Sequence, residues 1–479
     1  MMKNNGKQLH ILFFPFMAQG HTIPMLDIAN LFASRGHRAT IVTTPLNEPS
    51  IRRSVEKFND RVSSEIATRV INFPTLEEAG LPEGCENMDF ITSRNLCDEL
   101  VPNFFRATTL LRPQLESLME ECKPDCLVAD SFFPWSTAAA AEKFGIPRLI
   151  FNGMGFFAMS VLASLSASEK VCSDGEEFLV QGIPDRIFLT RRQLPEAERE
   201  EDEFLVGLFG EMKESESKSF GVIFNCFYEL EPTYADYYRN QLGRRAWHIG
   251  PVSLGSSNRG SKNRGNDDQE CLKWLDTKDP DSVIYICFGS MVNFGAAQLK
   301  EIAEGLESSG QHFIWVVRKN PGDPNEDWLP EGFEERTAGR GLIIRGWAPQ
   351  VRILEHEAIG GFLTHCGWNS TLEAVSAGVP LVAWPVQAEQ FLNEKLVTEV
   401  AKIGASVGVK EGAVYGGIVG REQIEKAVRR VMVGEEGEEM RRRVKELAAM
   451  AAQAVEEGGS SYSDFDDLIG EIQSESCCR

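Results

Sequence analysis

The chain has 479 residues, which is longer than a single hydrophobic core usually supports, so we expect two domains. Its composition, with 42% hydrophobic and 25% charged residues, is that of a globular protein and excludes the disordered, fibrous and membrane-embedded classes. Lys and Arg number 49 against 71 Asp and Glu, and the formal net charge of -22 argues against nucleic acids and anionic membrane surfaces as partners.

The amino terminus and the cysteines indicate where the protein works. The apolar stretch at residues 9–16 is too short for the core of a signal peptide or for a membrane span. The eleven cysteines form no Cys-x-x-Cys pair and have no metal-ligand spacing. We therefore expect a monomeric cytoplasmic protein with reduced thiols, no membrane insertion and no bound metal.

Short apolar runs alternate with helical patterns through the first half of the chain. The run 11–14, the helical pattern 23–35 and the run 39–43 have the β-α-β order of a parallel sheet. Further strands, separated by helices, are expected at residues 69–73, 126–129, 148–151, 221–225 and 247–249. These elements predict a parallel sheet that is covered on both faces.

A second domain follows a stretch without periodicity. Residues 254–269 are rich in Gly, Ser, Asn and charged residues and are typical of a linker. The alternation then restarts, with a helix at 296–308 and strands at residues 283–288, 313–317, 342–344, 361–363 and 381–383. Two closing helices are expected at 421–433 and 438–457, before a break at Gly458-Gly459.

The predicted fold class is α/β, with two doubly wound, Rossmann-like domains that face each other across a cleft. We assign residues 1–250 to the first domain and 251–458 to the second, with a carboxyl-terminal segment, 459–479, that packs back on the first. Folds of this kind bind ligands at the carboxyl ends of their strands, so the active site is expected in the cleft.

The densest group of chemically informative residues lies in the second domain. It contains the sequences WAPQ (347–350), GFLTHCGWNSTLE (361–373) and EQ (389–390). This segment resembles the donor-binding signature of the plant secondary-product UDP-glycosyltransferases. The resemblance extends over essentially the whole chain, including Gly20-His21 and Phe288-Gly-Ser290, and is greatest to flavonoid and coumarin glucosyltransferases.

The resemblance implies a fold and an activity. The fold is the GT-B type, in which the first domain binds an acceptor and the second a UDP-sugar. The activity is transfer of glucose from UDP-glucose, as a co-substrate, to a small hydroxylated acceptor, phenolic or terpenoid, with inversion at the anomeric carbon. No cofactor and no metal are implied.

Local physics supports an anion site in the same segment. A strand that ends at Thr364 and a helix that begins near Ser370 direct free backbone amides and a positive dipole end toward a diphosphate. Gly367 allows close backbone approach, while His365 and Asn369 can add hydrogen-bond donors.

The resemblance gives nearby residues roles in donor recognition. Trp347 stacks on uracil, the Ala348 backbone bonds the base edge, and Gln350 binds the ribose. Ser290 and Trp368 also belong to the implied donor site. From the residues alone, a single Trp after a strand more often packs in a core.

Three acidic and amide side chains complete the implied donor site. Glu373 grips the ribose hydroxyls, although its spacing from Ser370 also fits a helix capping box. Glu389 and Gln390 recognise the hexose, with Gln favouring glucose, and their alternative role is helix-start polarity. Trp384 is expected to be a core residue.

His21 and Asp130 are the candidate catalytic residues. His21 follows the first strand at a helix start, and the resemblance makes it the general base for the acceptor hydroxyl, kept neutral by the helix dipole. Asp130 ends a strand of the same sheet, so it can hydrogen-bond His21 and fix its tautomer. Helix capping is the competing role for Asp130.

The acceptor pocket is expected among apolar residues of the first domain, although core packing explains these side chains equally well. The candidates are Phe16, Met17, Phe133, Met154 and Phe156.

Three other functions fit parts of the sequence less well. Residues 153–158 match a Gly-rich dinucleotide fingerprint, but they lie outside the first β-α unit and bulky aromatic residues follow the glycines. Asp279-Pro-Asp281 precedes a strand, where a turn is expected rather than a metal site. An inactive sugar-nucleotide-binding protein is the third alternative, and intact His21 and Asp130 argue against it.

Overall fold

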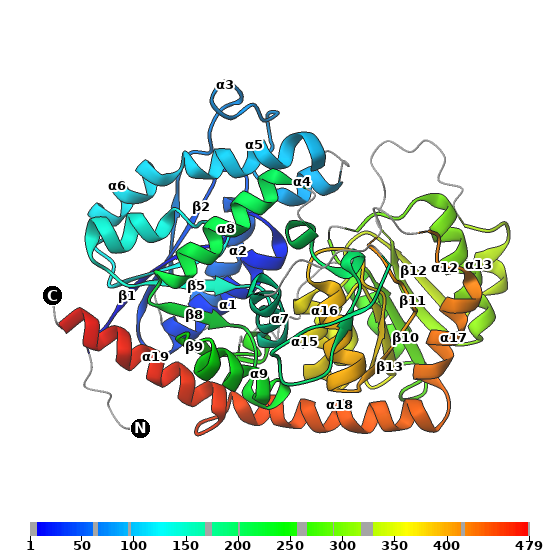
Figure 1. Ribbon diagram of the computed structural model, residues 1–479. Helices are drawn as coiled ribbons and strands as arrows, with labels where there is room; N and C mark the ends of the chain where they lie inside the picture. Colours follow the sequence, from blue (N-terminus) through cyan, green and yellow to red (C-terminus); the bar gives the residue numbers. More distant parts are fainter. Residues whose placement is uncertain are drawn as a thin grey trace.

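Two parallel sheets form the centre of the computed structural model, and helices pack around both of them (Figure 1). This arrangement confirms the predicted α/β class with two doubly wound halves. The predicted linker at 254–269 lies mostly outside the described residues. The structure describes residues 7–60, 66–93, 97–167, 175–199, 202–255, 266–290, 292–317, 329–412 and 417–477.

The first sheet has seven strands in the order β3-β2-β1-β4-β5-β8-β9. Its strands are β1 (His10–Phe14), β2 (Arg38–Thr43), β3 (Ile66–Val70), β4 (Cys126–Asp130), β5 (Arg148–Asn152), β8 (Gly221–Phe224) and β9 (Ala246–His248). Ile11 and Phe13 face one buried layer while Leu12 and Phe14 face another, because successive side chains of a strand point to opposite sides. Both faces of the sheet are therefore covered.

Two predictions for this half are wrong in detail. The strand expected at 69–73 is β3 and begins at Ile66, because this edge strand has polar residues and pairs with β2 from Ala39 onward. The helix expected between the strands at 126–129 and 148–151 is a π-helix, η1 (Ala138–Lys143). The apolar period of an Ala-rich stretch does not distinguish the two hydrogen-bond patterns.

Helices and one small antiparallel pair complete the first half. The π-helix η5 (Tyr237–Gln241) follows α9. The other elements are α1 (Gln19–Ser34), α2 (Glu48–Asn59), α3 (Leu76–Ala79), α4 (Met88–Ser93), α5 (Cys97–Thr109), α6 (Arg112–Cys122), α7 (Phe156–Ala167), β6 (Phe178–Leu179), β7 (Phe188–Leu189), α8 (Glu203–Ser217), α9 (Pro232–Asp236) and α10 (Val252–Gly255).

The second sheet has six strands in the order β12-β11-β10-β13-β14-β15. They are β10 (Val283–Cys287), β11 (His312–Val317), β12 (Gly341–Arg345), β13 (Ile359–Thr364), β14 (Leu381–Ala383) and β15 (Gly404–Ser406). β15 was not expected, since its three small residues give no apolar run. The helices are α11 (Asn266–Leu275), α12 (Ala296–Ser309), α13 (Phe333–Arg336), α14 (Gln350–Leu354), α15 (Trp368–Ala377), α16 (Gln390–Lys395), α17 (Arg421–Met432) and α18 (Glu435–Ala454).

One hydrophobic cluster belongs to both halves. It joins Phe156 and Phe157 of α7 to Trp368 and Leu372 of α15 and Leu392 of α16. The two sheets are therefore connected by a continuous apolar contact. The domain boundary at residue 250 remains a prediction.

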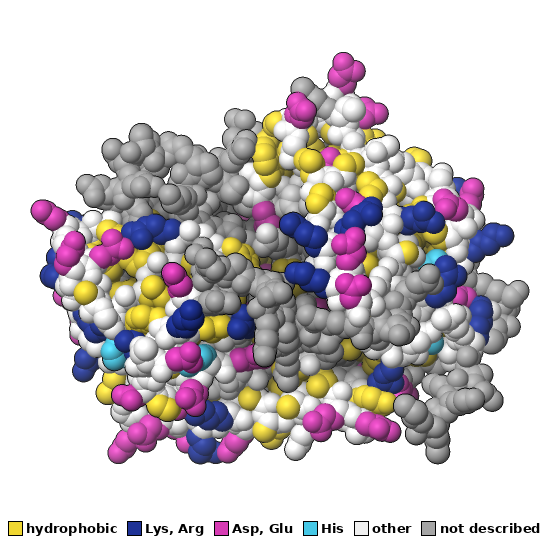
Figure 2. All heavy atoms as spheres, turned by 180° about the vertical axis from the view of Figure 1, so that it is seen from behind, with side chains coloured by type: hydrophobic (Ala, Val, Ile, Leu, Met, Phe, Trp, Pro, Cys, Tyr) yellow, Lys and Arg dark blue, Asp and Glu magenta, His cyan; other side chains and the backbone are white. Residues whose placement is uncertain are grey.

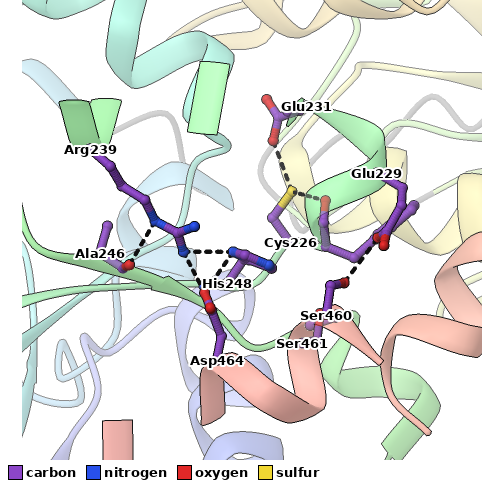
Figure 3. Close-up of polar contacts among 11 residues, drawn as sticks. Cys226, Glu229, Glu231, Arg239, Ala246, His248, Ser460, Ser461 and Asp464 are labelled. Atoms are coloured by element: carbon purple, nitrogen blue, oxygen red, sulfur yellow. Dashed lines mark hydrogen bonds and ion pairs between the residues drawn. The ribbon is translucent and has the colours of Figure 1, made fainter. Parts of the chain in front are cut away.

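The last helix, α19 (Ser460–Cys477), returns to the first half, while α18 runs along the second (Figure 1). Phe465 and Leu468 of α19 are buried against β1 and α1 residues. Asp464 accepts a hydrogen bond from the backbone N–H of His248 (3.0 Å) and pairs with Arg239 (Figure 3). Apolar and charged contacts together anchor the helix.

The surface seen from behind has acidic and basic side chains interspersed (Figure 2). Among the helices of the described residues, none combines the length and the apolar composition that crossing a membrane requires.

Candidate active site

The ends of two neighbouring strands bring His21 and Asp130 together. β1 and β4 pair in parallel, and Phe14 lies opposite Ala129. Asp130 is the last residue of β4, while His21 lies in the first turn of α1, just beyond β1. His21 Nδ1 is 2.8 Å from Asp130 Oδ2; the aspartate side chain is fully buried and the histidine side chain is 23% exposed.

The pair defines the chemistry of the imidazole. When neutral His21 donates its Nδ1 proton to Asp130, Nε2 is left as the proton acceptor. Burial lowers the pKa of His21, but the Asp130 carboxylate, with smaller contributions from Glu389 and Asp89, outweighs burial, and the pKa is raised. The carboxylates therefore act against the helix dipole, which was expected to keep the imidazole neutral.

Asp130 is itself held by its surroundings. Its Oδ1 accepts a hydrogen bond from the backbone N–H of Phe132 (3.1 Å), so the carboxylate orders the turn after β4 as well as the imidazole. Buried Arg148 donates from Nη2 to the carbonyl oxygens of Asp130 (3.2 Å) and Phe133 (3.3 Å). Burial lowers the pKa of Arg148 to about 9.

The predicted anion site lies at the start of α15. The helix begins at Trp368, two residues earlier than expected, and Gly367 is its N-cap without a side-chain cap. The first amides of a helix, here those of Trp368, Asn369 and Ser370, have no intrahelical acceptor. They form the type of site that binds phosphate.

His365 lies beside this helix start, between two glycines. A Cβ atom on Gly289 would lie 2.7 Å from His365 Cε1, and one on Gly367 would lie 2.5 Å from Nε2. Gly289 also has a φ of +74°, so a side chain there is strained for two reasons. Burial lowers the pKa of His365 to about 4, so the ring is neutral near pH 7 and donates one N–H at most.

The side chains assigned to the ribose form one hydrogen-bonded group. Gln350 Nε2 donates to Glu373 Oε2 (2.8 Å) and to Ser370 Oγ (3.1 Å). The capping-box alternative for Glu373 is wrong, because α15 starts two residues before Ser370 and its N-cap is Gly367. Burial raises the pKa of Glu373 to about 7.

Trp347 and Ala348 lie in the loop between β12 and α14. The Trp347 side chain is 56% exposed, so it is not a core residue, and Ala348 is buried. The carbonyl oxygen of Ala348 accepts a hydrogen bond from the backbone N–H of Gln350 (2.9 Å). The exposure of the indole argues against the core role that its residue type alone favours.

The side chains assigned to the hexose lie at the start of α16. Glu389 is its N-cap, and the pKa of Glu389 is raised by burial, against an opposing contribution from His21 in the other half. Gln390 is buried, and its Oε1 accepts from the amides of Val386 (2.9 Å) and Gln387 (3.1 Å). The side-chain oxygen therefore holds the loop between β14 and α16.

Three residues assigned to the donor instead contact the first half. The indole N–H of Trp368 donates to the Asn225 carbonyl oxygen (2.8 Å), so it is not directed at a donor. Asn369 Nδ2 donates to the Gly20 carbonyl oxygen (2.6 Å). Ser290 Oγ donates to Asp89 Oδ1 (3.3 Å).

The acceptor candidates separate into two groups. Phe16 lies edge-on to His21, with ring centroids 5.4 Å apart, and Met17 is buried in the same cluster. Phe133 is a core residue stacked on Phe14 at 4.3 Å, and Phe156 is one stacked on Phe224 at 3.9 Å. Neither belongs to the acceptor surface, because strand residues cover both rings.

Met154 is partly buried and packs against the cluster shared by both halves. Phe132 was not predicted, yet its ring centroid is 5.4 Å from that of His21. Asp89, which accepts from the Gln19 amide (3.2 Å), was also missed. Phe132 lies two residues after Asp130 and was detectable, whereas Asp89 arrives from a distant helix.

The alternative motifs have structural roles. Gly153 lies against the His21 ring, since a Cβ there would be 3.4 Å from Cε1, and Gly155 lies against Trp368. Asp281 has a φ of +54° in a turn before β10, and its carboxylate is 3.0 Å from Lys445 Nζ. The turn interpretation of this sequence is correct. Trp384 is a buried core residue, as expected.

Known proteins resemble the chain along almost its whole length. The profile of a family described as UDP-glucoronosyl and UDP-glucosyl transferase matches residues 258–447. Scopoletin glucosyltransferase of Nicotiana tabacum is 54% identical over 478 residues, which cover 97% of this chain and 98% of that protein. UDP-glucose flavonoid 3-O-glucosyltransferase 7 of Fragaria ananassa is 53% identical over 490 residues, with 98% of each covered.

A solved structure has the same arrangement of both halves. Glycyrrhiza uralensis UGT73P12, complexed with glycyrrhetinic acid 3-O-monoglucuronide, aligns with a TM-score of 0.88 and 40% sequence identity. The alignment covers 98% of this chain and 97% of that one.

Proposed function

Because the chain belongs to the plant secondary-product UDP-glycosyltransferases, enzymes with the GT-B fold, we propose that it transfers glucose from UDP-glucose to a small acceptor hydroxyl with inversion. The observation that carries the proposal is the His21–Asp130 pair, at 2.8 Å, within electrostatic reach of Glu389 from the other half. A base and a sugar-site carboxylate therefore share one cleft.

The reaction is a single displacement. His21 Nε2 accepts the acceptor's hydroxyl proton as the acceptor oxygen bonds to the anomeric carbon, and Asp130 stabilises the imidazolium that forms. The bond between that carbon and the diphosphate oxygen breaks at the same time, and UDP leaves. The amides at the start of α15 and the neutral His365 stabilise the charge on the departing diphosphate. No metal takes part in the proposed step.

The proposed donor contacts follow the side chains described above. Trp347 stacks on uracil, Ala348 bonds the base edge, and Gln350 with Glu373 binds the ribose. Glu389 and the amide nitrogen of Gln390 bind the glucose. In this proposal, residues 251–458 hold the donor and residues 1–250 hold the acceptor.

We propose phenolic acceptors in particular. The half-buried ring of Phe132 lies beside His21 at a centroid distance of 5.4 Å and can contact an aromatic acceptor, while the buried ring of Phe16 packs behind it at 4.8 Å. The relatives named for scopoletin and for flavonoids agree with this choice.

The test is UDP release from UDP-glucose with a panel of flavonols, coumarins and simple phenols, with mass spectrometry of the products. We expect acceptor-dependent release and a glucosylated product. His21→Ala should lower kcat by about 10²- to 10⁴-fold and leave UDP affinity nearly intact, because only the base is lost. His356→Ala, at a histidine paired with Asp276 outside the cleft, is the control.

Three results would overturn the proposal. UDP binding without any transfer would indicate an inactive binding protein, and equal turnover in His21→Ala would exclude this base. Oxidation or reduction of a nicotinamide cofactor in place of UDP release would indicate an oxidoreductase.

A further inference from the structure

The indole of Trp368 crosses from the second half into the first. Trp368 is the first residue of α15, and its side chain is 2% exposed. Its Nε1–H donates to the carbonyl oxygen of Asn225, just after β8, at 2.8 Å. The hydrogen-bonding capacity of this side chain is therefore used in the first half and is not available to a sugar or a phosphate.

The first half has a receptacle for this indole. A Cβ atom on Gly155 would lie 2.6 Å from Trp368 Cη2 and 2.8 Å from each carboxylate oxygen of Glu231. Real Cβ atoms do not approach other atoms so closely, so the absence of a side chain at Gly155 makes room for the ring.

A buried carboxylate, that of Glu231, holds the backbone beside Gly155 in place. Glu231 is 2% exposed and accepts hydrogen bonds from the backbone amides of Phe157 (2.7 Å) and Phe156 (3.2 Å) at the start of α7. It also accepts from the Cys226 thiol at 2.9 Å (Figure 3). The loop before α7 is thereby held against the ring.

The next residue of α15 makes a second connection, beside the base. Asn369 Nδ2 donates to the Gly20 carbonyl oxygen at 2.6 Å. That oxygen is available because Pro24, four residues later in α1, has no N–H to donate to it. Gly20 directly precedes His21, so the connection ends one residue from the imidazole.

Two attachments by consecutive residues define both the distance and the orientation of a helix end. We propose, on the basis of the function proposed above, that Trp368 is a positioning residue: its indole, seated on Gly155 and bonded to Asn225, keeps the diphosphate-binding turn of α15 in register with His21. The side chain thus acts on the alignment of donor and base and makes no contact with the donor. Misplacement by about 1 Å is enough to lower a rate by about a hundredfold.

The first test is Trp368→Phe, which keeps an aromatic ring but removes the N–H and the Cη2 atom. We expect kcat to fall by about tenfold to a hundredfold, while the Kd for UDP, measured by calorimetry, changes by less than about threefold. Trp315→Phe is the matched control, because Trp315 is also buried in the second half but lies in β11. Its kcat should stay within about twofold of wild type.

The second test is a double-mutant cycle with Gly155→Ala. The added methyl group should lower kcat in the wild-type background because it collides with the indole. In the Trp368→Phe background its effect should be smaller, because the Cη2 atom is absent and only the collision with the Glu231 carboxylate remains. A merely structural loss of stability would not produce this coupling in kcat.

The outcomes separate this inference from the proposed function. A wild-type protein that transfers no glucose contradicts the function itself. If the wild type is active, an unchanged kcat in Trp368→Phe overturns the positioning role, as does a large loss of UDP affinity, which would indicate a donor contact. If the effects of the two substitutions on kcat simply multiply in the double mutant, the positioning role is also overturned.

Discussion

Glu373 shows how a single residue can be tuned before any ligand binds. One of its carboxylate oxygens accepts from Gln350 at 2.8 Å, and burial raises its pKa to about 7. A ribose with two hydroxyl donors binds the ionised carboxylate best, because the protonated form has lost acceptor capacity. In the proposed donor site, binding and deprotonation of Glu373 are therefore coupled.

The affinity for UDP-glucose should consequently depend on pH. As the pH falls below about 7, Glu373 takes up a proton and the Kd should rise, by up to about tenfold per pH unit. Calorimetry in the His21→Ala background is the suitable measurement, because turnover is removed and His21 no longer titrates. UDP-glucose is preferred to UDP because its diphosphate carries no terminal phosphate that titrates nearby.

Glu373→Gln is the matched variant for this prediction. It keeps the size of the side chain and cannot ionise, so its Kd should be high and its pH profile flatter than with Glu373, with only a contribution from Glu389 left. An equally flat profile in the protein with Glu373 would contradict the coupling.

The roles of some residues could be predicted from the sequence and those of others could not. The contact between His21 and Asp130 was predictable because both follow neighbouring strands of a parallel sheet. The roles of Trp368 and Gln390 Oε1 were not, because each depends on a partner whose position is set by tertiary packing. A motif names residue types, but it does not state which atom of a side chain is already engaged.

At the scale of elements, strong apolar runs gave strands close to their observed bounds, such as β4 and β14. Strands were predicted poorly where tertiary packing, and not an apolar run in the sequence, determines them, as at edge strand β3 and at β15. α1 begins at Gln19 and not at residue 23 as expected, because Pro24 lies inside the helix and not in its first turn. Helix starts matter here, since α1 and α15 carry the two sides of the site.

Helix α19 is the element whose contribution to stability can be measured most directly. Leu468 is fully buried against the first sheet, so Leu468→Ala should lower the free energy of unfolding by about 2 to 5 kcal/mol. Asp467→Ala, at the exposed neighbouring position, should change it by less than about 0.5 kcal/mol. Denaturant unfolding measures both, and equal stability of the two variants would show that α19 is not part of the core.

At the scale of the whole molecule, two sheets are joined so that the proposed base lies in one half and the proposed anion site in the other. The sequence predicted both sheets, because each β-α alternation was visible. It did not predict the apolar cluster that the halves share, since contacts between distant segments leave no periodic signal. This cluster, with the Trp368 and Asn369 hydrogen bonds, brings His21 and the start of α15 together.

The proposed reaction is a single displacement between an acceptor activated by the base in one half and a donor bound in the other. The most direct test is the anomeric configuration of the product, read from the proton coupling constant in an NMR spectrum of the isolated glucoside. Because the donor sugar of UDP-glucose is α-linked, a single displacement gives a β-glucoside. An α-glucoside would contradict it, since retention requires two displacements or an attack from the same face as departing UDP.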